Sequence, residues 1–245
     1  MKHLSAFLLC VFAIVTLLVS GCGSSNTQST SGAAPDVAAI KSRGVLKVGV
    51  KVDVPKFGFK DPQTNKIDGM EIDIAREMAK KILGDPNKIE LIGVTAKTRG
   101  PLLDNGEVDL VIATFTITEE RKQSYNFSEA YFTDGVAMMV KKASGIQAVK
   151  DLDGKKIGVA QSATSRKSLQ EACDKAGVKV QFLEFGTYPE IKTALDSGRI
   201  DVFSVDGSIL AGYLDDSTII LAERFTPQQY GVASKKANTA LAKVV

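Results

Sequence analysis

Apolar runs alternate with helix-like patterns along most of the chain. The run at residues 45–50 predicts a strand. Met70, Ile74, Met78 and Ile82 then recur every four residues, as on the buried face of an amphipathic helix. Further strands are predicted at 89–94, 108–113, 156–160, 178–182 and 200–205. Because strands and helices alternate, the pattern predicts an α/β fold with largely parallel sheets.

One short pattern occurs twice. Residues 103–109 read Leu-Asp-Asn-Gly-Glu-Val-Asp and residues 195–201 read Leu-Asp-Ser-Gly-Arg-Ile-Asp, and an apolar run follows each. A weaker echo pairs Val-Gly-Val at 48–50 with Ile-Gly-Val at 157–159. Two echoes in the same order predict two similar α/β units. Ligands of open α/β sheets bind beyond the carboxyl ends of strands, so Thr114 and Asp206 are expected to face one cleft from opposite sides.

The first 21 residues have the pattern of an export signal. Lys2 and His3 precede an apolar stretch that ends in small residues before Cys22. The stretch is shorter than the roughly 20 apolar residues that a membrane span needs. Val-Ser-Gly-Cys at 19–22 resembles the bacterial lipobox, which implies a lipid on Cys22. Residues 22–36, rich in Gly, Ser and Thr, are expected to form a flexible tether.

The composition narrows the chemistry once the signal is removed. The single histidine is His3, so the mature chain would contain neither a histidine-based nucleophile system nor a histidine-ligated metal site. Cys173 would lack a partner inside the domain, and its surroundings predict a buried helix residue. The net charge is only +3 and the two signs are interspersed, which does not favour a nucleic-acid-binding protein.

Several charged and hydroxyl side chains fall at predicted strand ends and helix starts. A free amino acid presents a carboxylate and an ammonium, so its site needs an anion holder and a cation holder. Candidates for these roles are Lys51, Arg99, Thr114, Thr116, Arg121, Asp206 and the helix start at 162–165. Simpler roles stay open: the arginines could pair with surface acids, Asp206 could cap a helix, and Tyr188 could only pack. Phe57 and Phe59 are expected in the core rather than in a ligand wall.

Longer motifs resemble a known family. Residues 108–122 and 125–128 look like the signature of the family 3 extracellular solute-binding proteins, which are polar amino-acid receptors of ABC importers. Residues 69–75, 151–155 and 228–231 match further motifs, and the resemblance runs from about residue 41 to the end of the chain. Within the family, the segments 48–51, 97–106, 158–161 and 203–206 are most similar to the aspartate/glutamate-binding branch.

The resemblance implies a role for each candidate residue. Arg121 and Thr116 would hold the α-carboxylate, and Asp206 the α-ammonium. The side-chain carboxylate would be surrounded by Lys51, Arg99, Thr114 and Tyr188. Thr164 would contact the ligand from the second lobe. Glutamine-binding relatives tend to carry an acid near position 51, whereas a lysine suits a carboxylate. The expected ligand is therefore L-aspartate or L-glutamate, and the alternative is glutamine, cystine or another polar amino acid.

The implied fold is the two-lobed type II periplasmic-binding fold. Residues 37–138 and 224–245 would form lobe one, and residues 139–223 lobe two. The protein would be a monomer without cofactor, held by its lipid outside the cell membrane or in the periplasm, and it would deliver ligand to a permease by hinge closure. The rival class is a dehydratase-type enzyme. Such an enzyme would need an acid/base residue at the cleft, and the mature chain would contain no histidine for that role. Two departures from the family stand out: an aromatic is missing at 53–57, and the chain ends at Val245, which predicts a truncated last helix.

Overall fold

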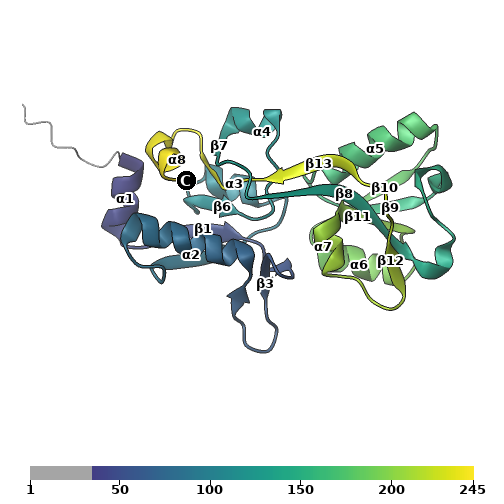
Figure 1. Ribbon diagram of the computed structural model, residues 1–245, viewed down its shortest axis with the longest axis horizontal. Coiled ribbons are helices and arrows are strands. Elements are labelled where there is room, and N and C mark those ends of the chain that lie inside the picture. The colour runs from purple at the N-terminus through teal and green to yellow at the C-terminus, as the bar shows by residue number, and fades with distance from the viewer. Residues whose placement is uncertain (1–34) are drawn as a thin grey trace, which may run out of the picture. The chain divides into compact units, whose positions relative to one another are not determined.

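The computed structural model describes residues 35–245, which form two large β-sheets flanked by helices and one small three-stranded sheet (Figure 1). The predicted signal, the lipidation site Cys22 and almost all of the predicted tether lie outside the described residues. Within residues 35–245, the helices are too short or too polar to cross a bilayer.

Lobe one is built on a five-stranded sheet. Its strand order is β5 (Ile89–Gly93), β1 (Leu46–Val50), β6 (Leu110–Ile112), β14 (Ala233–Lys235) and β7 (Tyr125–Phe127). Strand β1 is parallel to β5 and β6, whereas β14 is antiparallel to both of its neighbours. The helices of this lobe are α1 (Pro35–Arg43), α2 (Met70–Leu83), α3 (Arg99–Asp104), α4 (Glu119–Ser124) and α8 (Thr239–Val244). A small sheet of β2 (Asp53–Val54), β3 (Gly58–Lys60) and β4 (Ile67–Asp68) adjoins it.

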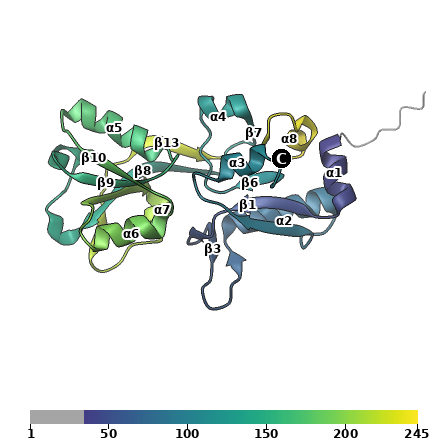
Figure 2. The ribbon, with the colours of Figure 1, turned by 180° about the vertical axis from the view of Figure 1, so that it is seen from behind.

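Lobe two is built on a six-stranded sheet. Its main path is β10 (Gln181–Phe185), β9 (Lys156–Ala160), β11 (Val202–Asp206), β8 (Phe132–Lys141) and β12 (Thr218–Ile220), and β13 (Phe225–Tyr230) also pairs with β8. Its helices are α5 (Ser165–Ala176), α6 (Tyr188–Asp196) and α7 (Gly207–Ala211), with two 3-10 turns at Lys142–Ser144 and Val149–Leu152. Strands β8 and β13 run side by side between the two lobes (Figures 1 and 2).

Both sheets are covered on both faces, as the continuous apolar runs predict. In β6, Leu110 and Ile112 pack in one cluster with α1 and α2, whereas Val111 packs in a second cluster with α3. In β11, Val202 joins the cluster under α5, and Phe203 joins the cluster under α6 and α7. This alternation follows from the two-residue period of a strand.

Local sequence signals account for the boundaries of the main helices. Helix α2 ends at Gly84, whose φ of 76° lies in the left-handed region that glycine adopts without strain. Helix α6 begins with the predicted capping box: the Thr187 hydroxyl accepts from the Glu190 backbone N–H, and the Glu190 carboxylate accepts from the Thr187 N–H at 3.0 Å. Cys173 lies fully buried in α5, as predicted.

The internal echo corresponds to equivalent hydrogen bonds in the two lobes. The Asp109 carboxylate accepts from the backbone N–H of Lys47, and the Asp201 carboxylate accepts from that of Lys156, both at 2.8 Å. Each aspartate follows a turn with a left-handed glycine, at φ values of 76° and 75°. The repeated aspartate therefore ties the end of each turn to a strand of its lobe, β1 in lobe one and β9 in lobe two.

The glycines of the weaker echo lie where a helix or side chain approaches the sheet closely. A Cβ at Gly158 would lie 2.4 Å from the Ile200 side chain and 2.7 Å from that of Ile191, whereas a Cβ at Gly49 would lie 3.1 Å from Val94. We expect Gly158→Ala to reduce the free energy of unfolding by about 1–3 kcal/mol through overpacking. Gly49→Ala should reduce the free energy of unfolding by less. Urea denaturation of the two variants measures both losses. Equal losses would contradict this explanation.

Three predictions are wrong. The sheets are mixed rather than largely parallel, because β8 and β14 pair with all of their neighbours in antiparallel fashion. The strand predicted at 178–182 is displaced to Gln181–Phe185, because Val178 and Val180 pack under α5 from the turn that follows the helix. Phe59 is not in the core: it lies in β3 and is 38% exposed. Phe57, by contrast, is buried against Phe132, with ring centroids 5.1 Å apart.

Candidate ligand-binding site

Asp206 ends strand β11 of lobe two and is 4% exposed. Its Oδ2 accepts a hydrogen bond from the Tyr230 hydroxyl at 2.5 Å, whereas its Oδ1 has no hydrogen-bond partner among residues 35–245. It precedes α7, but its side chain makes no capping bond there, so the helix-cap interpretation does not apply. Burial raises the pKa of this carboxyl to about 7. The buried oxygen is available for a cationic partner.

Thr114 follows strand β6 of lobe one and has a φ of 46°, which is unusual for a threonine. Its backbone N–H donates to the Glu71 Oε1 at 2.5 Å, and its hydroxyl donates to the carbonyl of Ala113. Arg99 is also buried, and its Nη1 donates to the carbonyls of Ala113 and Thr114 at 2.6 and 3.0 Å. Part of the Arg99 guanidinium thus supports the end of β6, and Nε has no partner in the described chain.

Lys51 follows β1 and is 1% exposed. Its Nζ forms an ion pair with Asp53 at 2.9 Å and lies 4.6 Å from the centre of the Tyr188 ring. Burial lowers the pKa of Lys51, and the charge of Asp53 counteracts that effect. The sequence interpretation treated Lys51 as a free cation, but in the structure a neighbouring acid offsets its charge.

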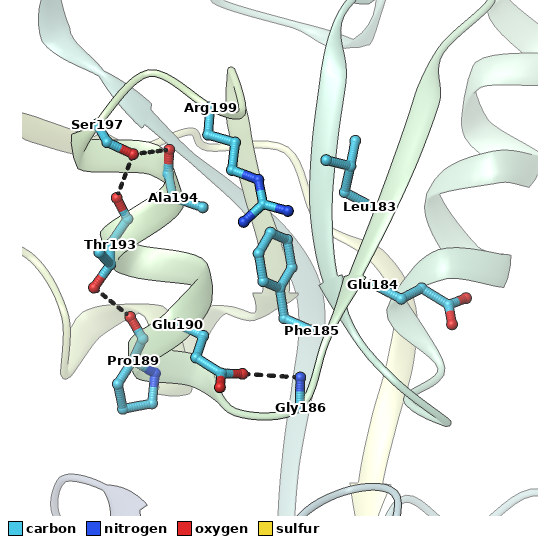
Figure 3. A pocket seen from close by; sticks show the side chains of 10 residues that line it. All are labelled: Leu183, Glu184, Phe185, Gly186, Pro189, Glu190, Thr193, Ala194, Ser197 and Arg199. Carbon is cyan, nitrogen blue, oxygen red and sulfur yellow. Dashed lines mark hydrogen bonds between the residues drawn. The ribbon is translucent and has the colours of Figure 1, made fainter.

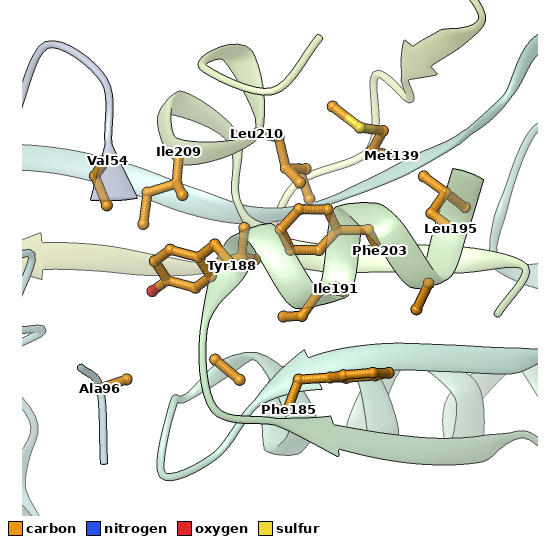
Figure 4. Close-up of a cluster of buried hydrophobic side chains, with 14 of the residues drawn as sticks. Val54, Ala96, Met139, Phe185, Tyr188, Ile191, Leu195, Phe203, Ile209 and Leu210 are labelled. Carbon is orange, nitrogen blue, oxygen red and sulfur yellow. The ribbon is translucent and has the colours of Figure 1, made fainter. Parts of the chain in front are cut away.

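Tyr188 brings lobe two against this part of lobe one. Its backbone N–H donates to Asp53 at 3.4 Å, and its ring packs in an apolar cluster that contains Val54 and Ala96 from lobe one and Phe203 from lobe two (Figure 4). Tyr188 therefore packs in the apolar cluster and also lies beside Lys51. Burial raises the pKa of the Tyr188 hydroxyl, so it remains a neutral donor at physiological pH.

Arg121 lies in α4 with its guanidinium over the Phe115 ring, 4.6 Å from the ring centre. Its Nη1 donates to the Thr116 carbonyl at 2.8 Å, and its Nη2 donates to the carbonyl of Ser162 in lobe two at 3.2 Å. Burial lowers the pKa of Arg121 to about 9, which leaves it a cation at neutral pH. Thr118 caps the helix by accepting from the Arg121 N–H at 3.1 Å.

Thr116 and Thr164 meet at one side chain that sequence analysis did not select. The hydroxyls of both threonines donate to the Gln228 Oε1 at 2.7 Å. Gln228 comes from β13, whereas Thr116 belongs to lobe one and Thr164 begins α5 of lobe two. Together with Arg121 these residues line a cavity of about 740 Å³ between α4 and α5.

Glu71 is a second buried polar residue to which sequence analysis assigned no role. It lies in the first turn of α2, and its side chain has no exposed surface. Besides the Thr114 N–H, its Oε1 accepts from the Tyr131 hydroxyl at 2.6 Å. Glu71 lies two residues after Gly69, in a segment that resembles a motif of the family. An acid in the first turn of a helix is, however, usually explained by the helix dipole.

Three of the eight predicted residues, Thr116, Arg121 and Thr164, line the cavity between α4 and α5. The other five are buried and do not line it: Lys51, Arg99, Thr114, Tyr188 and Asp206. The rings and charges connect them: Arg99 and Arg121 both stack on Phe115, and the charge of Asp206 acts on both arginines. A second hollow of about 700 Å³ lies between β10 and α6, where Arg199 stands over Phe185 (Figure 3). None of the eight predicted residues lines it.

Comparison with known proteins gives the class of the protein. The chain is similar to an ABC transporter periplasmic binding protein from Brucella ovis with glutathione bound, with a TM-score of 0.79, 27% identity, and coverage of 85% of this chain and 67% of that one. The fold is accordingly the two-lobed α/β fold of periplasmic binding proteins, as predicted. The model of the bacterial extracellular solute-binding proteins, family 3, matches residues 46–167, and a model described as NMT1/THI5 like matches residues 130–240.

Relatives extend the likeness over the whole chain. The ABC transporter glutamine-binding protein GlnH of Bacillus subtilis is 40% identical and covers 100% of this chain and 89% of its own length. A glutamine-binding protein of Geobacillus stearothermophilus is 45% identical over 87% of this chain and 81% of its own length. The chain belongs to the bacterial extracellular solute-binding proteins, family 3. These relatives are solute receptors rather than enzymes, in agreement with the expected non-catalytic function.

Proposed function

We propose that the chain is the amino-acid receptor of an ABC importer and that its ligand is L-glutamine. The charge balance around Lys51 carries this proposal. Lys51 and Arg99 are the cations expected to surround the ligand side chain, but Asp53 pairs with Lys51 at 2.9 Å, and Glu71 is buried beside them. The ion pair with Asp53 offsets one of the two cations, which suits a neutral amide better than a second carboxylate.

The two similar relatives support the same ligand, since both are named as glutamine-binding proteins. The expected preference for L-aspartate or L-glutamate rested on Lys51 and Arg99 as free cations, and the ion pair with Asp53 weakens that argument. L-Glutamate remains the second candidate, because Arg99 keeps a buried Nε without a partner among the described residues.

The remaining roles follow from the same site. Arg121, with Thr116 and Thr164 nearby, would hold the α-carboxylate, and Asp206 would hold the α-ammonium through its free Oδ1. Lys51, Arg99, Thr114 and Tyr188 would surround the side-chain amide. The ligand would bridge the lobes and favour the closed form, which then docks on the permease. We further propose residues 37–138 with 224–245 and residues 139–223 as the two moving bodies. With these bounds β13 and most of β8, which the sheet pairing assigns to lobe two, belong to the first body. We also propose a monomeric lipoprotein anchored through Cys22.

Calorimetry with the signal-free protein tests the ligand. We expect L-glutamine to bind most tightly among L-glutamine, L-glutamate, L-aspartate, L-arginine and L-cystine. A ligand at 100 times its dissociation constant should also stabilise the protein by about 2.7 kcal/mol in thermal unfolding. Tighter binding of L-glutamate or L-aspartate would refute the glutamine assignment, and no binding of any amino acid would refute the receptor assignment.

A further inference from the structure

Glu71 has one carboxylate oxygen in use and one free. The Oε1 atom accepts from the Thr114 backbone N–H at 2.5 Å and from the Tyr131 hydroxyl at 2.6 Å. The Oε2 atom is buried and has no hydrogen-bond partner within residues 35–245. A buried acceptor without a partner is costly, so this oxygen calls for a donor from outside the chain.

The surroundings of Glu71 place it at the proposed ligand side chain. Glu71 is linked to Arg99 through Thr114: its Oε1 accepts from the Thr114 N–H, and the Thr114 carbonyl accepts from the Arg99 Nη1 at 3.0 Å. Burial raises the pKa of Glu71, and the charges of Lys51 and Arg99 counteract that effect. Its hydrogen-bond partner Thr114 is buried and follows β6 of lobe one. The carboxyl group therefore belongs to the same buried cluster as the predicted side-chain residues, although it comes from a helix and not from a strand end.

A purely structural role does not require a carboxylate at this position. The two hydrogen bonds that fix Thr114 and Tyr131 both end on Oε1, and a glutamine could accept both with its amide oxygen. The second oxygen is therefore unexplained by the fold. It becomes useful if the ligand presents an N–H group there, and it disfavours a ligand that presents another carboxylate, because two acceptor oxygens would then face each other.

We propose that Glu71 is a specificity-determining residue of the receptor, whose Oε2 accepts a hydrogen bond from the side-chain amide of the ligand and discriminates against acidic amino acids. The assignment rests on the proposed capture of L-glutamine. By holding the Thr114 N–H, Glu71 also keeps that residue in its left-handed conformation and so directs the Thr114 carbonyl to Arg99. One carboxyl group thus positions the strand end and selects the ligand.

The test compares Glu71→Gln with Glu77→Gln, which removes an exposed charge from the same helix. Calorimetry gives the dissociation constants of L-glutamine and L-glutamate for both variants and for the unchanged protein. In Glu71→Gln, the preference for L-glutamine over L-glutamate should fall by about ten- to hundredfold, the range expected for one hydrogen bond to a charged group. Glu77→Gln should keep the original preference. Hydrogen exchange of the Thr114 amide should remain protected in both variants.

The outcomes separate the two proposals. If the unchanged protein binds neither amino acid, the proposed function fails and the role of Glu71 with it. If it binds L-glutamine but Glu71→Gln keeps the same preference, only the role of Glu71 is overturned. If Glu71→Gln does not fold, a measurement on the unchanged protein tests the role of Glu71. The side chain of L-glutamate γ-methyl ester is neutral but lacks the amide N–H. The ester should therefore bind at least about tenfold more weakly than L-glutamine. Equal binding of the ester overturns the assignment.

Discussion

Asp206→Asn is expected to abolish amino-acid binding and yet to stabilise the ligand-free protein above about pH 7. The variant removes the only charge proposed to face the ligand ammonium. Loss of one partner of a buried ion pair typically costs about 3–5 kcal/mol, or roughly a hundred- to several thousandfold in affinity. Calorimetry with L-glutamine measures this loss. Asp216→Asn, an exposed change in the same lobe, is the control and should bind normally.

The gain in stability follows from the raised pKa of Asp206. Burial raises this pKa from 3.8 to about 7, so the folded protein holds the proton more tightly than the unfolded chain. Stability therefore falls as pH rises from about 4 to about 7, and above that the full cost of the buried charge remains. At about 1.4 kcal/mol per pKa unit, the cost is at most about 4 kcal/mol.

Thermal unfolding at two pH values checks the sign. Asp206→Asn should raise the melting temperature at pH 8, where the native carboxyl is charged, and should have little effect near pH 4. If Asp206→Asn destabilises the protein equally at pH 4 and pH 8, the charge of Asp206 is already compensated in the ligand-free state. Retention of L-glutamine binding would remove Asp206 from the proposed ammonium site.

Arg121→Ala should reduce affinity for L-glutamine by a comparable factor. The guanidinium stacks on Phe115 and donates to backbone carbonyls of both lobes, so it is held in place before any ligand arrives. A fixed, charged donor to a carboxylate is among the stronger hydrogen-bonding groups in proteins. Because Arg121 also donates to Ser162, its loss should weaken contact between the lobes as well as ligand capture.

Two further variants distinguish a direct role of Arg121 in ligand binding from a general effect on the fold. Arg121→Lys keeps the charge but cannot donate in a fork or stack as a planar group, so it should recover only part of the affinity. Arg166→Ala removes another arginine that stands over an aromatic ring, 5.7 Å from Phe182, but on the exposed side of α5. Affinity for L-glutamine should be unchanged in this control. A loss in Arg166→Ala equal to that in Arg121→Ala would indicate a general effect on the fold.

Much of the fold could be predicted from the sequence because its signals are local. The four-residue spacing in α2, the capping box at Thr187 and the repeated Gly-x-x-Asp turns each specify a short segment by its own hydrogen bonds or buried face. The error at β10 has the opposite cause. Val178 and Val180 are apolar because they pack under a helix from a turn, and an apolar run alone does not distinguish such a turn from a strand.

The candidate site was harder to predict because its charges act in pairs. Strand ends identified Thr114 and Asp206, and the chain does place them in one buried region. The sequence could not show that Asp53 offsets Lys51, since an acid two residues away in a turn could equally face solvent. Glu71 and Gln228 were missed for a related reason: they come from a helix and a connecting strand, and only tertiary contacts bring them to the strand ends.

The position of β14 has a consequence for the order in which the protein can fold. This strand lies between β6 and β7 and pairs with both, although it contains residues 233–235 and its neighbours come before residue 128. Until β14 is inserted, β7 has no partner that links it to the rest of its sheet. All of lobe two must therefore be synthesised before lobe one can complete its sheet. Such late, long-range pairing slows folding, and it keeps the sheet of lobe one incomplete until residues 233–235 have emerged.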